Sequence, residues 1–204
     1  SVAVPEAPLA SLSEELALSG ELTTRDFAFA SLFELWGLEY TSGSQTGCSQ
    51  AAAAGLACLS QRGSWNGLRQ LNRPSLLTII DNDGDSHELV LTAIHDDRAE
   101  LSSGGVAVTH PVSEITAFWL GEFSLLWRPP FGMPVSLSPG SRGAEVLWLR
   151  QSLADIDKRY ISDIIDSDVY DTNLQVIVRE FQRDHRLAVD GLVGQRPFII
   201  INSL

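Results

Sequence analysis

The sequence has little cysteine, little positive charge and no long hydrophobic run. Its 204 residues include 14 Lys and Arg against 26 Asp and Glu, which gives a formal net charge of −12. An acidic chain without a basic stripe is unsuited to nucleic acid and to electrostatic attachment on anionic lipid. No apolar stretch approaches the roughly 20 residues that cross a bilayer. These absences argue against nucleic-acid binding and against a membrane span within the sequence.

The opening residues, Ser-Val-Ala-Val-Pro-Glu-Ala-Pro, are more typical of a linker than of a natural start. No signal peptide is visible. We therefore expect a piece of a longer protein, in which any membrane span or cytoplasmic domain lies upstream of Ser1.

Cys48 and Cys58 are the two cysteines of the sequence. They can form a disulfide if Gly55 breaks the intervening helix and the chain returns on itself. An oxidising compartment such as the periplasm would favour this bond. Two buried free cysteines, a metal pair or a catalytic thiol are the alternatives, although the spacing does not suit a metal site.

A proline-rich segment divides the sequence. Residues 127–134 hold three prolines and a glycine, and a helix cannot run through them. We expect a linker over 128–138 between a front domain, 21–127, and a C-terminal domain, 139–204, with a linker or helix over 1–20.

The front domain has mixed helical and strand patterns. Residues 24–37 read as an N-capped helix that ends at a glycine. Further patterns predict short helices over 49–54 and 65–70, and strands over 56–59, 75–80, 88–94, 99–101 and 122–127. Together they predict an α+β domain with a mostly antiparallel sheet.

The acidic run at residues 81–85 has two interpretations. Alternate carboxylates resemble the start of a Ca²⁺ loop, but Ser86 and Thr92 stand where Gly and Glu are required. Asp83-Gly84 between two predicted strands favours a hairpin turn instead. We expect neither a metal ion nor a cofactor.

Helical periodicity dominates residues 139–204. Apolar residues recur at helical spacing in two segments, which are Val146, Leu149 and Leu153, and then Leu174, Ile177, Val178 and Phe181. Asp171 or Thr172 is suited to N-cap the second helix, and a third helix should run from about Pro197. Asp190-Gly191 and Gly194 predict turns with positive φ.

The order of Pro139–Val146, Phe181–His185 and Asp190–Gly194 resembles the peptidoglycan-binding module of bacterial cell-wall hydrolases. The resemblance implies a small three-helix domain with a shallow groove for a glycan strand or a stem peptide. An arginine can form two parallel hydrogen bonds with a carboxylate of the wall peptide. A tyrosine offers a flat aromatic ring and a hydroxyl group that can form hydrogen bonds. The candidate binding residues beside the motifs are Arg142, Tyr170, Asp171, Gln182, Arg183 and Asp190. Arg142 and Asp190 have local capping or pairing as an alternative role.

The front domain resembles the papain-like cysteine peptidases that remove leader peptides from bacteriocins. The matching segments are Asp26-Phe27-Ala28, Ala51–Leu56, Leu71–Pro74, Ser86–Leu91, Ser103-Gly104 and Trp119-Leu120-Gly121. A thiol peptidase needs a thiolate, an imidazole and a group that orients the ring. Phe27 occupies the nucleophile position and Ser103 or Gly104 the orienting position, so only His87 remains. The resemblance therefore predicts a papain-like domain with degenerate catalytic positions.

The tandem order of these two domains is similar to the periplasmic region of the general secretion pathway protein A family. That family joins a cytoplasmic AAA+ ATPase through one membrane span to a periplasmic part. With a B-type partner it helps to insert and multimerise the outer-membrane secretin of type II secretion. The resemblance thus implies a non-catalytic, periplasmic anchor whose partners are peptidoglycan, the B-type protein and the secretin.

Two alternatives to this interpretation stay open. One is an active peptidoglycan hydrolase or cysteine peptidase, with Cys48 as nucleophile and His87 or His95 as base. The other is a structural wall adaptor without a role in secretion.

Overall fold

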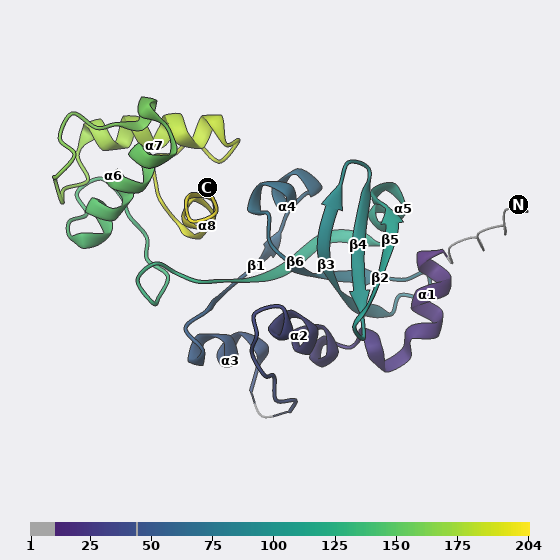
Figure 1. Ribbon diagram of the computed structural model, residues 1–204. Coiled ribbons are helices and arrows are strands. Elements are labelled where there is room, and N and C mark those ends of the chain that lie inside the picture. Colours follow the sequence, from purple (N-terminus) through teal and green to yellow (C-terminus); the bar gives the residue numbers. More distant parts are fainter. Residues whose placement is uncertain (1–10, 44) are drawn as a thin grey trace, which may run out of the picture. The chain divides into compact units, whose positions relative to one another are not determined.

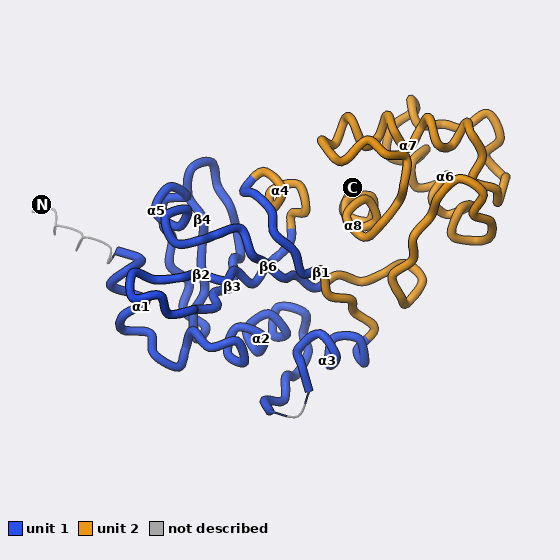
Figure 2. Tube along the Cα trace, turned by 180° about the vertical axis from the view of Figure 1, so that it is seen from behind, with its two compact units in different colours: residues 1–54, 60–65, 73–126 blue, residues 55–59, 66–72, 127–204 orange. Residues whose placement is uncertain are grey.

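The computed structural model describes residues 11–43 and 45–204. It contains two compact units, coloured separately in Figure 2. The front unit takes most of the chain up to Leu126, and the C-terminal unit takes residues 55–59, 66–72 and 127–204.

The front unit is built on a sheet with the strand order β1-β6-β2-β3-β4-β5. The strands are β1 (Ala57–Arg62), β2 (Ser75–Ile80), β3 (Ser86–His95), β4 (Arg98–Ser103), β5 (Val106–Pro111) and β6 (Trp119–Trp127). β2 pairs antiparallel with β3 and β6, and β4 with β3 and β5. The five predicted strands and the antiparallel sheet are confirmed. Only β5 was missed.

The hairpin turn predicted at Asp83-Gly84 is confirmed. The amide of Gly84 donates to the carbonyl oxygen of Asp81, and Gly84 has a φ of 88°. The Asp81 side chain accepts from the amides of Asp83 and Asp85. Its oxygens therefore organise the turn between β2 and β3.

Helix α2 packs against β2, β3 and β4 (Figure 1). α2 spans Arg25–Glu34, and the other helical elements before residue 127 are α1 (Leu12–Ser19), η1 (Gly20–Thr23), α3 (Gly47–Ala53), α4 (Trp65–Leu71) and α5 (Val112–Thr116). α2 buries Phe29, Leu32 and Phe33 at helical spacing, so its apolar face covers the sheet. The three helices predicted in this part of the chain are confirmed.

Helix α1 is attached to the sheet edge by a buried histidine. His110 of β5 is 2% exposed, and its Nε2 lies 2.8 Å from a carboxylate oxygen of Glu15. Glu114 of α5 lies 3.4 Å from the other ring nitrogen and also accepts the backbone amide of Leu12. Leu12 and Leu16 of α1 are also buried. Both glutamates therefore face one imidazole.

This cluster predicts a specific pH dependence. The hydrogen bond with Glu15 is the largest cause that raises the pKa of His110, against the opposing effect of burial. A pKa raised above the unfolded value of about 6.5 adds stability below that pH, which is lost as pH rises through the folded pKa. Urea unfolding from pH 5.5 to 8.5 should show wild type losing stability relative to His110→Gln. An unchanged difference across this range would contradict the prediction.

The C-terminal unit is helical. It contains α6 (Ala144–Ile156), η2 (Lys158–Tyr160), α7 (Thr172–Asp184) and α8 (Gln195–Ile201). All seven apolar residues predicted to face its core are buried. Asp171 N-caps α7, as one of the two predicted residues. α8 begins two residues before Pro197.

The turn after α7 is only partly as predicted. Gly191 has a φ of 75°, which confirms the expected left-handed conformation. Gly194 has a φ of −95° at the N-cap of α8, so the prediction of a positive φ was wrong there. Gly194 has the extended backbone that is typical of an N-cap, whereas Gly143, the N-cap of α6, has a φ of 119°.

A buried arginine, which the sequence did not reveal, holds the connection between α6 and α7. Arg150 is 1% exposed, and its guanidinium donates to Ser162, to the carbonyl oxygen of Val169 and to Asp171. Partial burial acts to raise the pKa of Asp171, but the Leu174 amide and Arg150 together lower it. One guanidinium thus fixes both ends of the loop and the cap of α7.

Replacement of Arg150 by Met should destabilise the C-terminal unit by about 2–3 kcal/mol, because charge-assisted hydrogen bonds are lost. The free energy of unfolding in urea measures this loss. The matched control is Arg183→Met, whose side chain is exposed on α7 and should change stability by no more than about 0.5 kcal/mol. If both variants changed the free energy of unfolding equally, the buried hydrogen bonds of Arg150 would add nothing to stability.

Candidate functional site

The three degenerate catalytic positions lie in the front unit without forming a catalytic arrangement. Phe27 is on α2 and is 42% exposed. His87 opens β3, with its Nδ1 2.8 Å from the hydroxyl of Thr23 and its Nε2 2.9 Å from Asp81. The Ser103 hydroxyl donates to the carbonyl oxygen of Leu22. The imidazole and the serine therefore have partners other than each other.

Element η1 supplies two of these partners, since Leu22 and Thr23 both belong to it. Thr23 is 2% exposed. The Leu22 side chain lies against Gly104, where a Cβ atom would come within 3.0 Å of a Leu22 methyl carbon. η1 consequently covers the side of the fold on which the resemblance places a histidine and its orienting group.

Both cysteines are disulfide-bonded. As they are the only two in the chain, the bond joins Cys48 at the start of α3 to Cys58 in β1. Gly55 has a φ of 74° between these elements, as the predicted chain reversal requires. The disulfide is confirmed, and the alternative in which a free Cys48 thiol is the nucleophile is wrong.

Replacing both cysteines by Ala should lower stability by about 2–3 kcal/mol, since the bond closes a loop of roughly ten residues. Urea unfolding with and without a thiol reductant measures this. Wild type should lose stability in reductant, whereas the double variant should not respond. A wild type that is indifferent to reductant would contradict a stabilising role.

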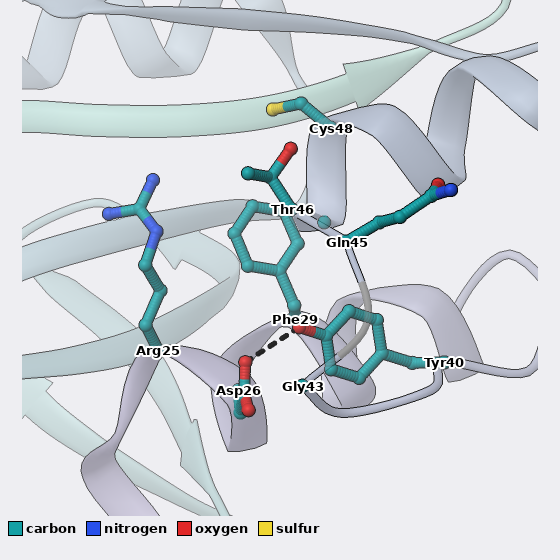
Figure 3. A pocket seen from close by; sticks show the side chains of 9 residues that line it. Arg25, Asp26, Phe29, Tyr40, Gly43, Gln45, Thr46 and Cys48 are labelled. Atoms are coloured by element: carbon teal, nitrogen blue, oxygen red, sulfur yellow. Dashed lines mark hydrogen bonds between the residues drawn. The ribbon is translucent and has the colours of Figure 1, made fainter.

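A pocket of about 450 Å³ lies beside the first turn of α2 (Figure 3). Its lining residues are Arg25, Asp26, Phe29, Tyr40, Gly43, Gln45, Thr46, Gly47 and Cys48. The rings of Phe29 and Tyr40 stack with centroids 6.1 Å apart, and the Arg25 guanidinium carbon lies 5.4 Å from the Phe29 ring centroid. A Cβ at Gly47 would come within 2.2 Å of Phe29, so this position needs glycine.

The polar groups of this pocket are largely satisfied internally. The Ser42 and Tyr40 hydroxyls donate to Asp26 and lower its pKa. Burial, followed by the Asp26 hydrogen bond, raises the pKa of Tyr40 to about 12. An ionised carboxylate beside a protonated phenol can orient a polar ligand.

A second hollow of about 310 Å³ lies on strands β1, β6 and β2 and shares Arg25. Arg25 forms an ion pair with Glu88, which is 7% exposed. Burial raises the pKa of Glu88, and Arg25 opposes that effect. Among residues 11–43 and 45–204, no three His, Cys, Asp or Glu side chains come together as a metal site.

In the C-terminal unit, three of the six candidate binding residues meet around Gly191. The buried Tyr170 donates its hydroxyl to the Gly191 carbonyl oxygen at 2.9 Å. The buried Gln182 donates to Asp190 and to the Leu192 carbonyl oxygen, and it accepts the Gly191 amide. The Leu192 amide is the largest cause that lowers the pKa of Asp190. These side chains fix one turn.

The other three candidates lie apart from this turn. Asp171 caps α7 and pairs with Arg150. Arg142 is exposed and forms an isolated β-bridge with Val169, and Arg183 is exposed on α7. Sequence reasoning missed Arg179, whose Nε lies 3.1 Å from the position of a Cβ at Gly191. Its spacing of four residues before Arg183 was the available signal.

The comparisons with known proteins agree with this architecture. A family model described as GspA, peptidase C39-like domain, matches residues 20–129, and a model for a peptidoglycan binding domain matches residues 142–196. The General secretion pathway protein A of Aeromonas hydrophila is 27% identical over 179 residues, which are 88% of this chain and 32% of that protein. The chain therefore spans about a third of the length of the curated relatives it matches.

A solved structure shares the fold across most of the chain. It is a periplasmic domain of the EpsAB fusion protein of the Vibrio vulnificus type II secretion system, with a TM-score of 0.55 and 26% identity. The match covers 90% of this chain and 79% of that one. None of the helices in the described ranges has the length and apolarity to span a membrane. The chain belongs to the GspA family, with a peptidase C39-like domain followed by a peptidoglycan-binding domain.

Proposed function

We propose that this chain is the non-catalytic, periplasmic, peptidoglycan-binding region of a type II secretion assembly factor. In this proposal the C-terminal unit binds the wall. The front unit presents a surface to a B-type partner and helps the outer-membrane secretin to insert and multimerise. The family match, the relative named General secretion pathway protein A and the solved periplasmic domain support the proposal. The disulfide suits the periplasm.

The position of η1 is the observation that best supports a front unit without peptidase activity. Catalysis by a thiol peptidase needs an imidazole that can take a proton from the nucleophile. In this chain His87 is hydrogen-bonded to Thr23 and to Asp81, and Phe27 has no proton to give. The front unit therefore keeps the scaffold of a peptidase and serves in binding.

The proposal also includes the domain limits and the residues that touch the wall. We place the N-terminal segment at 1–20, the peptidase-like domain at 21–127, the linker at 128–138 and the peptidoglycan-binding domain at 139–204. Arg142 and Arg183 are exposed and can reach a ligand. Tyr170, Asp171, Gln182 and Asp190 act by holding the backbone around them, because their polar atoms already bond within the unit.

Co-sedimentation with insoluble peptidoglycan sacculi tests the proposal. The full chain should bind, Arg142→Ala should weaken binding several-fold through loss of a charged contact, and no muropeptides should be released into the supernatant. The control is Arg62→Ala in the front unit, whose exposed side chain pairs with Glu122 and should leave wall binding unchanged. Released fragments would favour the hydrolase, and absence of binding would refute the wall anchor.

A further inference from the structure

The exposed side of α7 carries two arginines that form no ion pair. Arg179 and Arg183 are both exposed, and in the ranges that the structure describes neither takes part in a salt bridge. Residues four apart on a helix are neighbours, with Cβ atoms about 5–6 Å apart. Acidic residues outnumber basic ones 26 to 14 in this chain, so two adjacent unpaired arginines are unexpected.

The Asp190-Gly191 turn lies directly beside Arg179. A Cβ at Gly191 would come within 2.9 Å of the Gln175 side chain and within 3.1 Å of Arg179 Nε. The missing Cβ therefore lets both side chains lie on the turn. The stem of Arg179 packs there, so less rotamer entropy remains to be lost when its guanidinium binds a ligand.

The turn is itself rigid, because buried side chains hold it from below. Gln182 is 1% exposed and makes three hydrogen bonds to residues 190–192, and Tyr170 holds the Gly191 carbonyl oxygen. These hydrogen bonds fix the backbone of the turn on which the Arg179 side chain lies.

The charge of the surface selects the ligand. Asp190 is ionised at neutral pH like an ordinary aspartate, and hydrogen bonds, first that of the Leu192 amide, lower its pKa further. Its carboxylate is engaged by Gln182 and by the Leu192 amide. Arg179 and Arg183 outnumber the Asp190 carboxylate at the turn, and Glu180, three residues before Arg183, is a second exposed carboxylate on α7. The forked donors of arginine match carboxylates, whereas the hydroxyl groups of a neutral sugar need no positive charge.

We propose that Gln175, Arg179 and Arg183 form a carboxylate-binding stripe that recognises the stem peptides of peptidoglycan and not its glycan strands. This inference rests on the proposed wall binding and names the component that is bound. Arg179 is the central contact, Arg183 is the second cation, and Gln175 offers its amide to the peptide backbone.

Sacculi with chemically altered stem peptides test this assignment. The full chain should bind untreated sacculi at least about tenfold more tightly than sacculi whose free carboxylates have been converted to amides, or than glycan strands freed of stem peptides by an amidase. Arg179→Gln and Arg183→Gln should each weaken binding to untreated sacculi by about tenfold, as expected for loss of one charged hydrogen bond.

Two controls separate folding from recognition. Arg186→Gln removes an exposed arginine just beyond α7 and should bind like wild type. Each variant should also keep the wild-type urea midpoint, because neither arginine makes a salt bridge. Arg179→Lys should bind with intermediate affinity, since it keeps the charge and loses the fork.

The outcomes distinguish failure of the proposed wall binding from failure of the carboxylate assignment. Failure of the full chain to bind untreated sacculi refutes the proposed function. Binding that is equal on untreated, amidated and peptide-free material overturns the carboxylate assignment and leaves wall binding intact. Binding that is lost on amidation but unchanged in both arginine variants places the carboxylate contact elsewhere and also overturns the inference.

Discussion

The hydrogen bonds between η1 and two strand residues determine what chemistry remains in the front unit. Thr23 contacts His87, and the Leu22 carbonyl oxygen accepts from Ser103. Thiol-based cleavage needs an imidazole that can take the proton of the nucleophile, and in this fold Thr23 and Asp81 are the partners of the two ring nitrogens of His87. In the proposed function, α2 and the sheet, with Phe27 at the position that matches the nucleophile, serve as a binding scaffold. The anchoring of α1 through His110 holds η1 next to these strands, because α1 runs directly into it.

In the C-terminal unit, hydrogen bonds from buried polar side chains likewise fix exposed loops. Arg150 and Gln182 are each 1% exposed, and each satisfies several backbone or side-chain groups at once. A buried polar group is costly unless its hydrogen bonds are made, so these residues specify one loop conformation. Arg150 fixes the segment that pairs with Arg142, and Gln182 fixes the turn beside Arg179. Both supports lie under exposed arginines, which fits a surface that binds anions.

The sequence predicted most helices and strands because their signals are local. The apolar, β-branched run in residues 75–80, the apolar spacing in α6 and α7 and the cap at Asp171 all arise within a few residues. β5 was missed because its six residues are partly exposed and end at Pro111, so they show little apolar alternation. The positive φ expected at Gly194 was wrong, because this residue is the N-cap of α8 with extended backbone and does not belong to a turn of the kind found at Gly191.

The roles of polar residues were harder to predict, because they depend on contacts distant in sequence. Gln182 and Tyr170 stand beside the motif as expected, yet their partners lie 9 and 21 residues away at Gly191. Likewise, nothing local marks Arg150 as buried, since its partners follow it by 12 to 21 residues. Sequence position thus located the region of the candidate site, and only the fold separated supporting side chains from exposed ones.

Chemical-shift mapping of the full chain with a soluble muropeptide tests the central claim most directly, because it reports binding and cleavage together. The account predicts shifts confined to amides of the C-terminal unit, near Arg142, α7 and Gly191, with the muropeptide recovered intact. Shifts centred on His87 and Ser103, together with cleavage of the muropeptide, would contradict it.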